Sequence, residues 1–437
     1  MLTELTIENF RVFDRAATLR LRPITVLIGR NSAGKSSLIK FLLMLQQSLG
    51  AHGADFLCPE GERVHLGAFS DLKNSVGKRT NLDFQMRFRT NDLPSAVERK
   101  MLEESRTEKF KLDSATERAE TNTARSRQGQ MSVREDDEAE YVVDTRIRYS
   151  RSKQSGHHSV SGMINGKPEF HQKTTNLSTS ELLRFGSQST DPAKSFQNFM
   201  ADRFLLPLRK EIHSWRHLSA IREESQRAIA TASPPAHDVG QRGEYALPHL
   251  QTIMKEKDGA DEFVLKYMAS VVEIVGLRFE SSMKGYLAHC RATNQNTGGE
   301  SYLNDFGFGV SQCLPIFVQG ALMEHGELLM IEQPEAQLHP TAQLEMGSFF
   351  CDLWNLRNVM TLVETHSSQI ILRLRRHIAK GDLKPEDVSL AYLHVAEDGC
   401  PSIKNIDIDS GGNLEKGLPM EFFGADVLES LNIGLKT

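Results

Sequence analysis

The 437-residue chain has an average globular composition, with 39% hydrophobic residues, 25% charged residues and a formal net charge of -5. These values suit a buried core in two or three lobes and exclude a strong overall attraction to nucleic acid. Five scattered cysteines without a C-x-x-C pair argue against a zinc ribbon or a disulfide framework and favour reduced thiols in the cytoplasm. The sequence predicts no signal peptide and no membrane span.

Residues 1–50 show a pattern of strand, turn, strand, glycine-rich loop and helix. Alternating apolar residues over 2–7 predict a short strand. Ile24–Ile28 is a continuous apolar run that ends at Gly29, which is typical of a strand buried on both faces. Apolar residues over 38–45 then recur at helical spacing, so a helix is expected to pack on the sheet.

The loop between this strand and this helix, GRNSAGKSS, satisfies the pattern G-x-x-x-x-G-K-[ST]. The backbone amides of such a loop and the N-terminus of the following helix bind phosphate oxygens. Lys35 is expected to reach the β- and γ-phosphates, and the hydroxyl of Ser36 is expected to bind Mg²⁺. The predicted cofactors are therefore ATP and Mg²⁺. The predicted phosphate-binding residues are Gly29, Arg30, Asn31, Ser32, Ala33, Gly34, Lys35, Ser36 and Ser37.

The middle of the chain changes character twice. Alternation over 82–88 and over 141–149 predicts strands. Between them, residues 95–140 are rich in charge and poor in aromatics, which favours a solvated helical insertion or a disordered loop over a dedicated binding arm. Residues 180–276 are predicted to be mainly helical. The helices expected there are Ser195–Ser214, Glu244–Lys257 and Ala260–Ile274.

The last third of the chain again combines strands with helices. Because the phosphate loop lies near residue 30 and its expected partners appear only after residue 300, both ends of the chain are expected to build one sheet. The middle is then an insertion or a second lobe. The strands predicted after residue 300 are Leu328–Ile331, Val359–Val363 and Leu390–Val395.

Polar motifs accompany these strands. Asn304–Ile316 is a glycine-rich turn that enters a helix. Glu332 ends one apolar strand, where a carboxylate can hold Mg²⁺ through water. His366 follows the next strand. The candidate catalytic residues are Glu332, Gln333, Glu335 and His366, and the candidate metal ligands are Ser36 and Glu332.

This order of motifs resembles the ABC-type ATPase heads of the RecF, SMC and OLD families. The segment QPEAQLHP resembles the E-P-E-x-x-L-H-P segment of the OLD and RecF-like branch. The greatest resemblance is to stand-alone prokaryotic AAA-type ATPases of that branch, some of which are encoded in antiphage defence islands. Residues 217–227, 239–244 and 406–423 are also similar to that group. The stretch 367–437 is expected to be too short for the Toprim nuclease domain of OLD nucleases.

The resemblance implies a role for each motif. His366 corresponds to the switch histidine, which hydrogen-bonds the γ-phosphate or the attacking water. Ala336–His339 corresponds to the loop that contacts a second head. The turn that caps the partner's γ-phosphate is S-x-G in most relatives. Here Gly307 and Gly309 occupy those positions and Ser311 follows, so the hydroxyl that serves is left open.

One position departs from the family pattern. ABC-type heads usually carry Asp-Glu at the end of the acidic strand, and here the pair is Glu332-Gln333. An amide can orient water but cannot accept its proton. Either Glu335 supplies the base or hydrolysis is slow. We therefore expect weak basal turnover and a long-lived ATP-bound dimer.

Other charged residues have alternative interpretations. Asp407 and Asp409 could be metal ligands of a nuclease, although a solvated face of an edge strand is favoured. Arg222, Arg227 and Arg242 could reach the nucleotide or a partner, or brace the fold.

The sequence thus predicts an α/β fold, an ABC-type P-loop ATPase head with an inserted, largely helical lobe. Residues 1–90 and 277–437 are expected to form the head, and 91–276 the lobe. The expected function is an ATP-binding and hydrolysing switch or scaffold, a homodimer or larger homo-oligomer that controls a separate nuclease or toxin in antiphage defence. The alternatives are a RecF-like DNA-repair ATPase that binds DNA directly, and an interaction module with a relic phosphate loop.

Overall fold

A computed structural model describes residues 1–50, 57–74, 81–90, 141–150, 155–164, 167–175, 209–230, 238–282, 287–396 and 399–414. The polar segment predicted at 95–140 lies outside these residues. So does most of the helix predicted at Ser195–Ser214, of which only the helical residues 209–214 are described.

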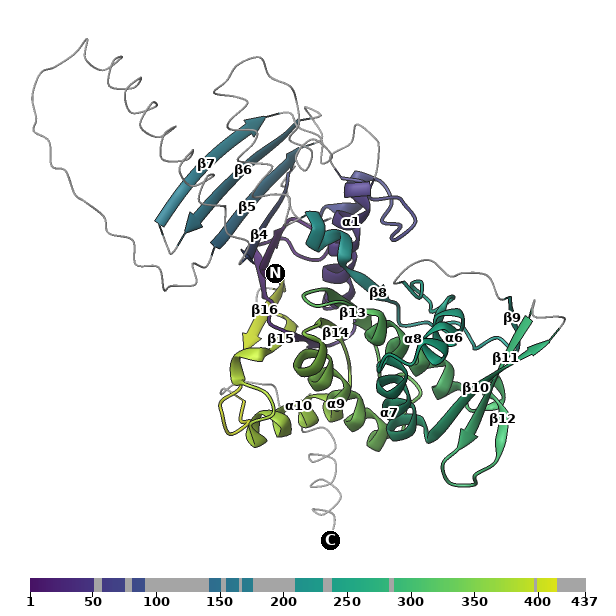
Figure 1. Cartoon of the computed structure of the whole chain (residues 1–437). Helices are drawn as coiled ribbons and strands as arrows, with labels where there is room; N and C mark the ends of the chain where they lie inside the picture. Colours follow the sequence, from purple (N-terminus) through teal and green to yellow (C-terminus); the bar gives the residue numbers. More distant parts are fainter. Residues whose placement is uncertain are drawn as a thin grey trace, which may run out of the picture.

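A six-stranded, mainly parallel sheet lies at the centre of the fold (Figure 1). Its order is β16-β15-β3-β14-β13-β8, and β16 runs antiparallel to β15. Every residue of β3 and β14 is buried, as expected of parallel strands covered on both faces. The strand predicted at Ile24–Ile28 is therefore confirmed. The strands are β3 (Ile24–Gly29), β8 (Arg216–Leu218), β13 (Leu328–Glu332), β14 (Met360–Glu364), β15 (Val388–Val395) and β16 (Pro401–Ile406).

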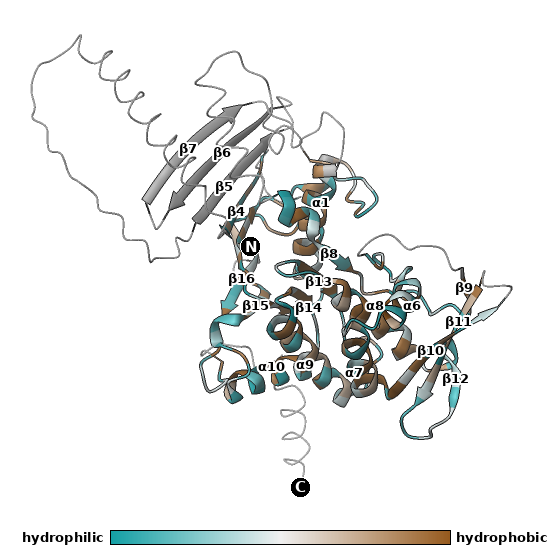
Figure 2. Cartoon of the chain, in the orientation of Figure 1, coloured by the Kyte–Doolittle hydropathy of each residue, from teal (hydrophilic) through white to brown (hydrophobic). Residues whose placement is uncertain are grey.

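Helices cover both faces of this sheet. Leu27 and Leu362 belong to the core shared with α1, whereas Val26 and Val363 belong to the core shared with α7, α8 and α9. The division follows from the two-residue period of a strand. Figure 2 shows hydrophobic residues along α7, α8 and the central strands. The helices are α1 (Lys35–Gly50), α2 (Phe69–Leu72), α6 (Ala246–Glu256), α7 (Ala260–Val272), α8 (Phe308–Leu322), α9 (Pro340–Arg357) and α10 (Ser368–Lys380).

A second, antiparallel sheet has the order β2-β1-β4-β5-β6-β7 and contains the first two strands of the chain. The strands predicted over 2–7, 82–88 and 141–149 all belong to it. β6 and β7 extend it by two strands that the sequence pattern did not predict. The strands are β1 (Leu2–Glu8), β2 (Ala17–Arg20), β4 (Leu82–Thr90), β5 (Tyr141–Ser150), β6 (Ser155–Ile164) and β7 (Lys167–Thr175).

A smaller antiparallel sheet lies at the far end of α6 and α7 (Figure 1). It contains β9 (Ile229–Ala230), β10 (Ile274–Ser282), β11 (Leu287–Asn294) and β12 (Glu300–Tyr302). Short 3₁₀ turns occur at Leu303–Asp305 and Pro385–Asp387.

The described residues within 180–276 contain predicted helices together with a strand of the central sheet. Helices α6 and α7 confirm two of the predicted helices. However, β8 pairs with β13 in the central sheet, and α7 packs on α8 and α9 in the same core as that sheet. A three-residue strand is too short to show a periodic pattern, so its position depends on the fold. The division at residues 90 and 276 stays a prediction.

The predicted α/β class is confirmed by the central parallel sheet and its covering helices. Within the ranges that the structure describes, no helix is long and apolar enough to span a bilayer.

Candidate functional site

The glycine-rich loop connects the end of β3 to the start of α1. Gly29 and Gly34 have φ of 142° and 105°, which favour glycine. A Cβ on Gly29 would lie 2.2 Å from the carbonyl oxygen of Leu393, and one on Gly34 would lie 2.7 Å from the ring of Phe13. Both glycines are therefore required by torsion and by space. The loop presents its backbone at the N-terminus of α1, the geometry that binds phosphate.

Lys35 lies inside this loop. Its side chain is buried, and its Nζ donates to the carbonyl oxygens of Gly29 at 2.9 Å and Arg30 at 3.0 Å. Burial lowers the pKa of Lys35, and the charges of Glu364 and Glu335 oppose that shift. The ammonium group of Lys35 therefore lies within the loop whose backbone would bind the phosphates.

Ser36 contacts a carboxylate that the sequence did not single out. Its hydroxyl lies 2.9 and 3.1 Å from the two carboxylate oxygens of Glu364, to which it can donate. Glu364 is the last residue of β14 and is buried. Burial raises the pKa of Glu364, the charge of Glu332 raises it further, and the Ser36 hydrogen bond opposes the shift. The sequence signal was available, because Glu364 ends a buried strand two residues before His366.

Glu332 ends the neighbouring strand, β13, and is the cross-strand partner of Glu364. Its Oε1 lies 2.9 Å from Nε2 of His217, a buried residue of β8. The two predicted metal ligands, Ser36 and Glu332, therefore have different hydrogen-bond partners. Glu364 ends β14, which lies between β13, the strand of Glu332, and β3, the strand that leads to the loop before Ser36.

The remaining predicted catalytic residues lie at the same edge of the sheet. Gln333 has φ of 47°, and its backbone N–H donates to the carbonyl oxygen of Glu364 at 2.7 Å. Glu335 Oε1 accepts from the backbone N–H of His366 at 2.6 Å. Within the described part of the chain, Glu335 Oε2 is buried without a hydrogen-bond partner.

His366 is exposed at this edge, after the end of β14. Partial desolvation of its ring is the largest cause that lowers its pKa, the charge of Lys35 also lowers it, and Glu335 opposes the shift. A neutral imidazole is therefore favoured at neutral pH, and it can both donate and accept hydrogen bonds. Such a ring suits contact with a phosphate oxygen or with water.

The glycine turn before α8 is open on one side. Gly307 caps α8, no described atom lies within 4 Å of the position that a Cβ would take there, and Phe308 is 46% exposed. Gly309 faces the loop after β13, since a Cβ there would lie 3.3 Å from the carbonyl oxygen of Gln337. The predicted nucleotide-capping turn thus lies beside the segment predicted to contact a second head.

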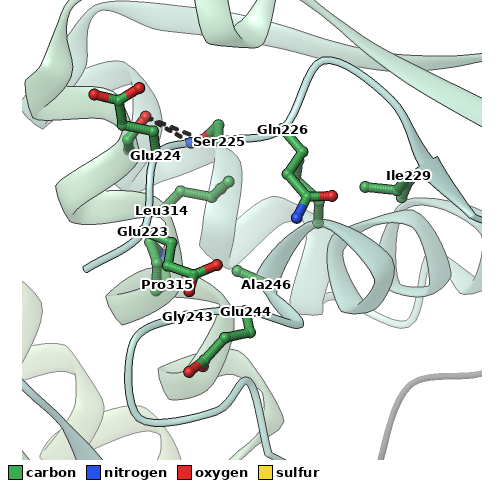
Figure 3. Close-up of a pocket in the computed structure, with 12 residues that line it drawn as sticks. Glu223, Glu224, Ser225, Gln226, Ile229, Gly243, Glu244, Ala246, Leu314 and Pro315 are labelled. Atoms are coloured by element: carbon green, nitrogen blue, oxygen red, sulfur yellow. Dashed lines mark hydrogen bonds between the residues drawn. The ribbon is translucent and has the colours of Figure 1, made fainter.

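The hydroxyl of Ser311, by contrast, is hydrogen-bonded within the same chain. Its side chain is buried, and its Oγ accepts from the backbone N–H of Ser225 at 3.0 Å and lies 3.2 Å from Ser225 Oγ. Figure 3 shows these bonds at Ser225. Of the three predicted capping residues, Gly307 lies in open space and the Ser311 hydroxyl does not.

A pocket lies between α8, residues 223–226 and the start of α6 (Figure 3). Its wall carries the carboxylates of Glu223, Glu224 and Glu244. Carboxylates repel phosphate, so this pocket differs in charge from the loop at Lys35.

Arg222 connects α8 to the end of β13. It is 2% exposed, its Nη2 donates to the carbonyl oxygen of Glu332 at 2.7 Å, and its own carbonyl accepts from Gln312 of α8 at 3.3 Å. Burial lowers the pKa of Arg222 to about 10. The charges of Glu335 and Glu332 favour its protonated form. These contacts support the interpretation that Arg222 braces the fold.

The other charged residues singled out from the sequence have local partners. Arg227 stacks 4.5 Å from the Tyr302 ring, and Arg242 lies 3.5 Å from Glu223. Asp407 pairs with Arg20 and Arg22, and Asp409 accepts from the turn at Gly411 and Asn413. In the described ranges, no group of three His, Cys, Asp or Glu side chains is arranged to hold a metal ion.

Comparisons with known proteins give a family and a set of similar structures. Residues 1–371 match the family described as AAA ATPase domain. No curated protein matches the chain. Among solved structures, the SMC head domain from Thermotoga maritima is 9% identical, with a TM-score of 0.40 over 93% of this chain and 99% of that chain.

Two complexes are also similar. An SMC head bound to the C-winged helix domain of ScpA is 9% identical, with a TM-score of 0.44 over 93% of this chain and 98% of that chain. An SMC head with an extended coiled coil, bound to the C-terminal domain of ScpA derived from Pyrococcus furiosus, is 10% identical. Its TM-score is 0.43, and the match covers 99% of each chain.

Proposed function

The chain belongs to the AAA ATPase domain family, and from this premise we propose that it binds ATP with Mg²⁺ and hydrolyses it slowly in a dimer of ABC-type heads. The observation that carries the proposal is the position of Lys35 and Ser36 at the start of α1, facing the carboxyl ends of β13 and β14. Backbone amides of the loop would bind the phosphates, and Lys35 would exchange its carbonyl contacts for phosphate oxygens.

The residues present fit a magnesium ion. Ser36 offers a hydroxyl, and the carboxylates at the two adjoining strand ends, Glu332 and Glu364, are the candidates for a further oxygen ligand. Mg²⁺ prefers such oxygen ligands and is usually held by one or two carboxylates together with substrate phosphates. When bound, the ion would neutralise charge on the β- and γ-phosphates.

Glu335 is the proposed general base. Gln333 carries an amide, which orients water without accepting a proton. Glu335 has one oxygen held by the His366 backbone and a second, buried oxygen without a partner among the described residues. That second oxygen can accept a proton from water placed near His366. The base thus comes from a position two residues further along the loop than in relatives with Asp-Glu.

A second copy of the chain is the proposed partner of the glycine turn. Gly307 and Phe308 are exposed, and Ile221, next to Arg222, is 74% exposed. A partner head that brings its own phosphate loop to this turn would cover these apolar groups. The site would then be shared between two chains, with the backbone of Gly307 taking the place of a missing capping hydroxyl.

We further propose that ATP-dependent assembly controls a separate effector, a nuclease or toxin, in antiphage defence. This part rests on the resemblance of the motifs to stand-alone ATPases of that branch. The alternative of a RecF-like DNA-repair ATPase predicts that the purified protein binds DNA with a log-linear dependence on salt. The net charge of -5 weighs against it.

The test measures the mass of the protein in solution with and without ATP and Mg²⁺, by analytical ultracentrifugation. We expect an ATP-dependent increase that Lys35→Ala abolishes. An ATP-independent mass, unchanged by Lys35→Ala, would contradict the proposal. Effector control is tested by affinity capture with and without ATP from the native host. Salt-sensitive DNA binding by the protein alone would favour the alternative.

A further inference from the structure

We propose that Glu364, not Glu332, is the carboxylate that works with Ser36 to hold the magnesium ion of the nucleotide. This inference rests on the proposed function, because it concerns the metal that accompanies ATP. In P-loop ATPases this carboxylate usually comes from the acidic strand, which here is β13. In this chain it would come from β14, the strand that also leads to His366.

The hydrogen-bond partner of Ser36 supports this assignment. A hydroxyl has one proton to donate and two lone pairs to offer. Ser36 lies within hydrogen-bond distance of both oxygens of Glu364. When the proton points to Glu364, the lone pairs remain free for a cation. A carboxylate in this position both orients the hydroxyl and adds negative charge next to the ion.

Strand order supports it as well. β14 lies between β3 and β13, so Glu364 is one strand nearer to the phosphate loop than Glu332. Neighbouring strands are separated by about 4.8 Å. The Ser36 hydroxyl accordingly lies within hydrogen-bond distance of Glu364, whereas the carboxylate of Glu332 lies against His217.

Glu332 is already engaged elsewhere. Its Oε1 is hydrogen-bonded to buried His217, and Arg222 donates to its backbone carbonyl. These contacts hold the end of β13 on the side that faces β8. In the described part of the chain, the side-chain donor to Glu364 is Ser36 itself. The Glu364 carboxylate is therefore tied to the residue with which it would share the ion.

The balance of charge also favours a cation next to Glu364. Glu364 is buried and is the cross-strand partner of Glu332, while the ammonium group of Lys35 is hydrogen-bonded to carbonyl oxygens of the phosphate loop. Two like charges in one buried site are unfavourable, and a divalent cation relieves them. Once Lys35 moves to the phosphates, the need for a cation next to Glu364 increases.

The test compares Glu364→Gln with the matched variant Glu332→Gln. Each is titrated with a fluorescent, slowly hydrolysed ATP analogue, once with Mg²⁺ and once with EDTA. We expect Mg²⁺ to tighten binding to the wild-type protein and to Glu332→Gln. In Glu364→Gln, this tightening is expected to shrink by about 30-fold, the scale for loss of one partner of a buried charge pair. Binding in EDTA is expected to stay equal or to improve, because a negative charge is removed.

A second readout is the number of Mn²⁺ ions bound with the analogue, counted by the loss of the free-ion EPR signal. One ion is expected for the wild type and for Glu332→Gln, and none at the same concentrations for Glu364→Gln. Circular dichroism and thermal unfolding establish that each variant is folded.

The outcomes separate the two proposals. If Glu364→Gln keeps the full effect of Mg²⁺, or if both variants lose it equally, the assignment of Glu364 is wrong while ATP binding stands. If the wild-type protein binds no analogue in either buffer, the proposed function fails and this inference fails with it.

Discussion

The two halves of the proposed composite site differ in how complete they are within one chain. On the phosphate-loop side, Lys35 and Ser36 are already in contact with the backbone and with Glu364, and most of these groups are buried. On the α8 side, Gly307 has open space around it and Phe308 is half exposed. One half is formed by the fold of a single head, and the other presents groups that the described part of the chain leaves uncovered.

This difference has a physical consequence. Removing buried contacts from the phosphate-loop side should strongly weaken nucleotide binding by a monomer. Changing exposed groups on the α8 side should leave nucleotide binding intact and affect only association. Substitutions on the two sides therefore test whether nucleotide binding and association depend on separate groups.

Replacement of Glu335 should have the largest effect on turnover. In Glu335→Gln, the oxygen proposed to accept the proton of water becomes an amide. We expect phosphate release to fall by about 10²-fold to 10⁴-fold, the usual contribution of a general base, with ATP affinity nearly unchanged. Rapid hydrolysis that is unaffected by this substitution would exclude both Glu335 as the base and slow turnover.

Replacement of Lys35 should have the largest effect on binding. Lys35→Ala removes the cation inside the loop, and we expect ATP affinity to fall by about 10²-fold, as measured by isothermal titration calorimetry. Arg30→Ala is the matched control, because Arg30 belongs to the same loop but is exposed. Equal losses of ATP affinity in both variants would show that binding depends on the total positive charge of the loop and not on the buried ammonium group of Lys35.

Replacement of Phe308 should weaken association alone. Phe308→Asp places a charge on the exposed turn, and we expect the ATP-dependent dimer to dissociate about 30-fold more readily, the scale of an interface hot spot. Leu356→Asp is the control, since Leu356 is 68% exposed near the C-terminal end of α9. Monomer ATP affinity should be unchanged in both. A dimer that tolerates Phe308→Asp but not Leu356→Asp would place the interface elsewhere.

The smallest effect concerns the stability of the nucleotide-free protein. Burial raises the pKa of Glu364, so the folded chain binds a proton more tightly there than the unfolded chain does. Stability from this group is therefore lost as pH rises from the unfolded pKa through the raised folded pKa. Glu364→Gln should raise the melting temperature by about 1–3 °C at pH 8, and by less at pH 5. A lower melting temperature at pH 8 would show that the Ser36 hydrogen bond outweighs the burial of charge.

Several features could be predicted from the sequence because they depend on neighbours in the chain. The phosphate loop is a run of consecutive residues between an apolar strand and a helix, and the torsions of Gly29 and Gly34 follow from that local geometry. The end of β13 at Glu332 follows from a continuous apolar run, and the helices α6 and α7 follow from the sequence of their own segments.

Other features were decided by the tertiary structure, because the residues involved are far apart in the sequence. Ser36 and Glu364 are separated by 328 positions and meet only because β14 is inserted between β3 and β13. The three-residue strand β8, too short to show periodicity, brings His217 to Glu332. Sequence order identifies which strands carry polar residues at their ends. Only the order of strands in the sheet decides which of those residues share one site.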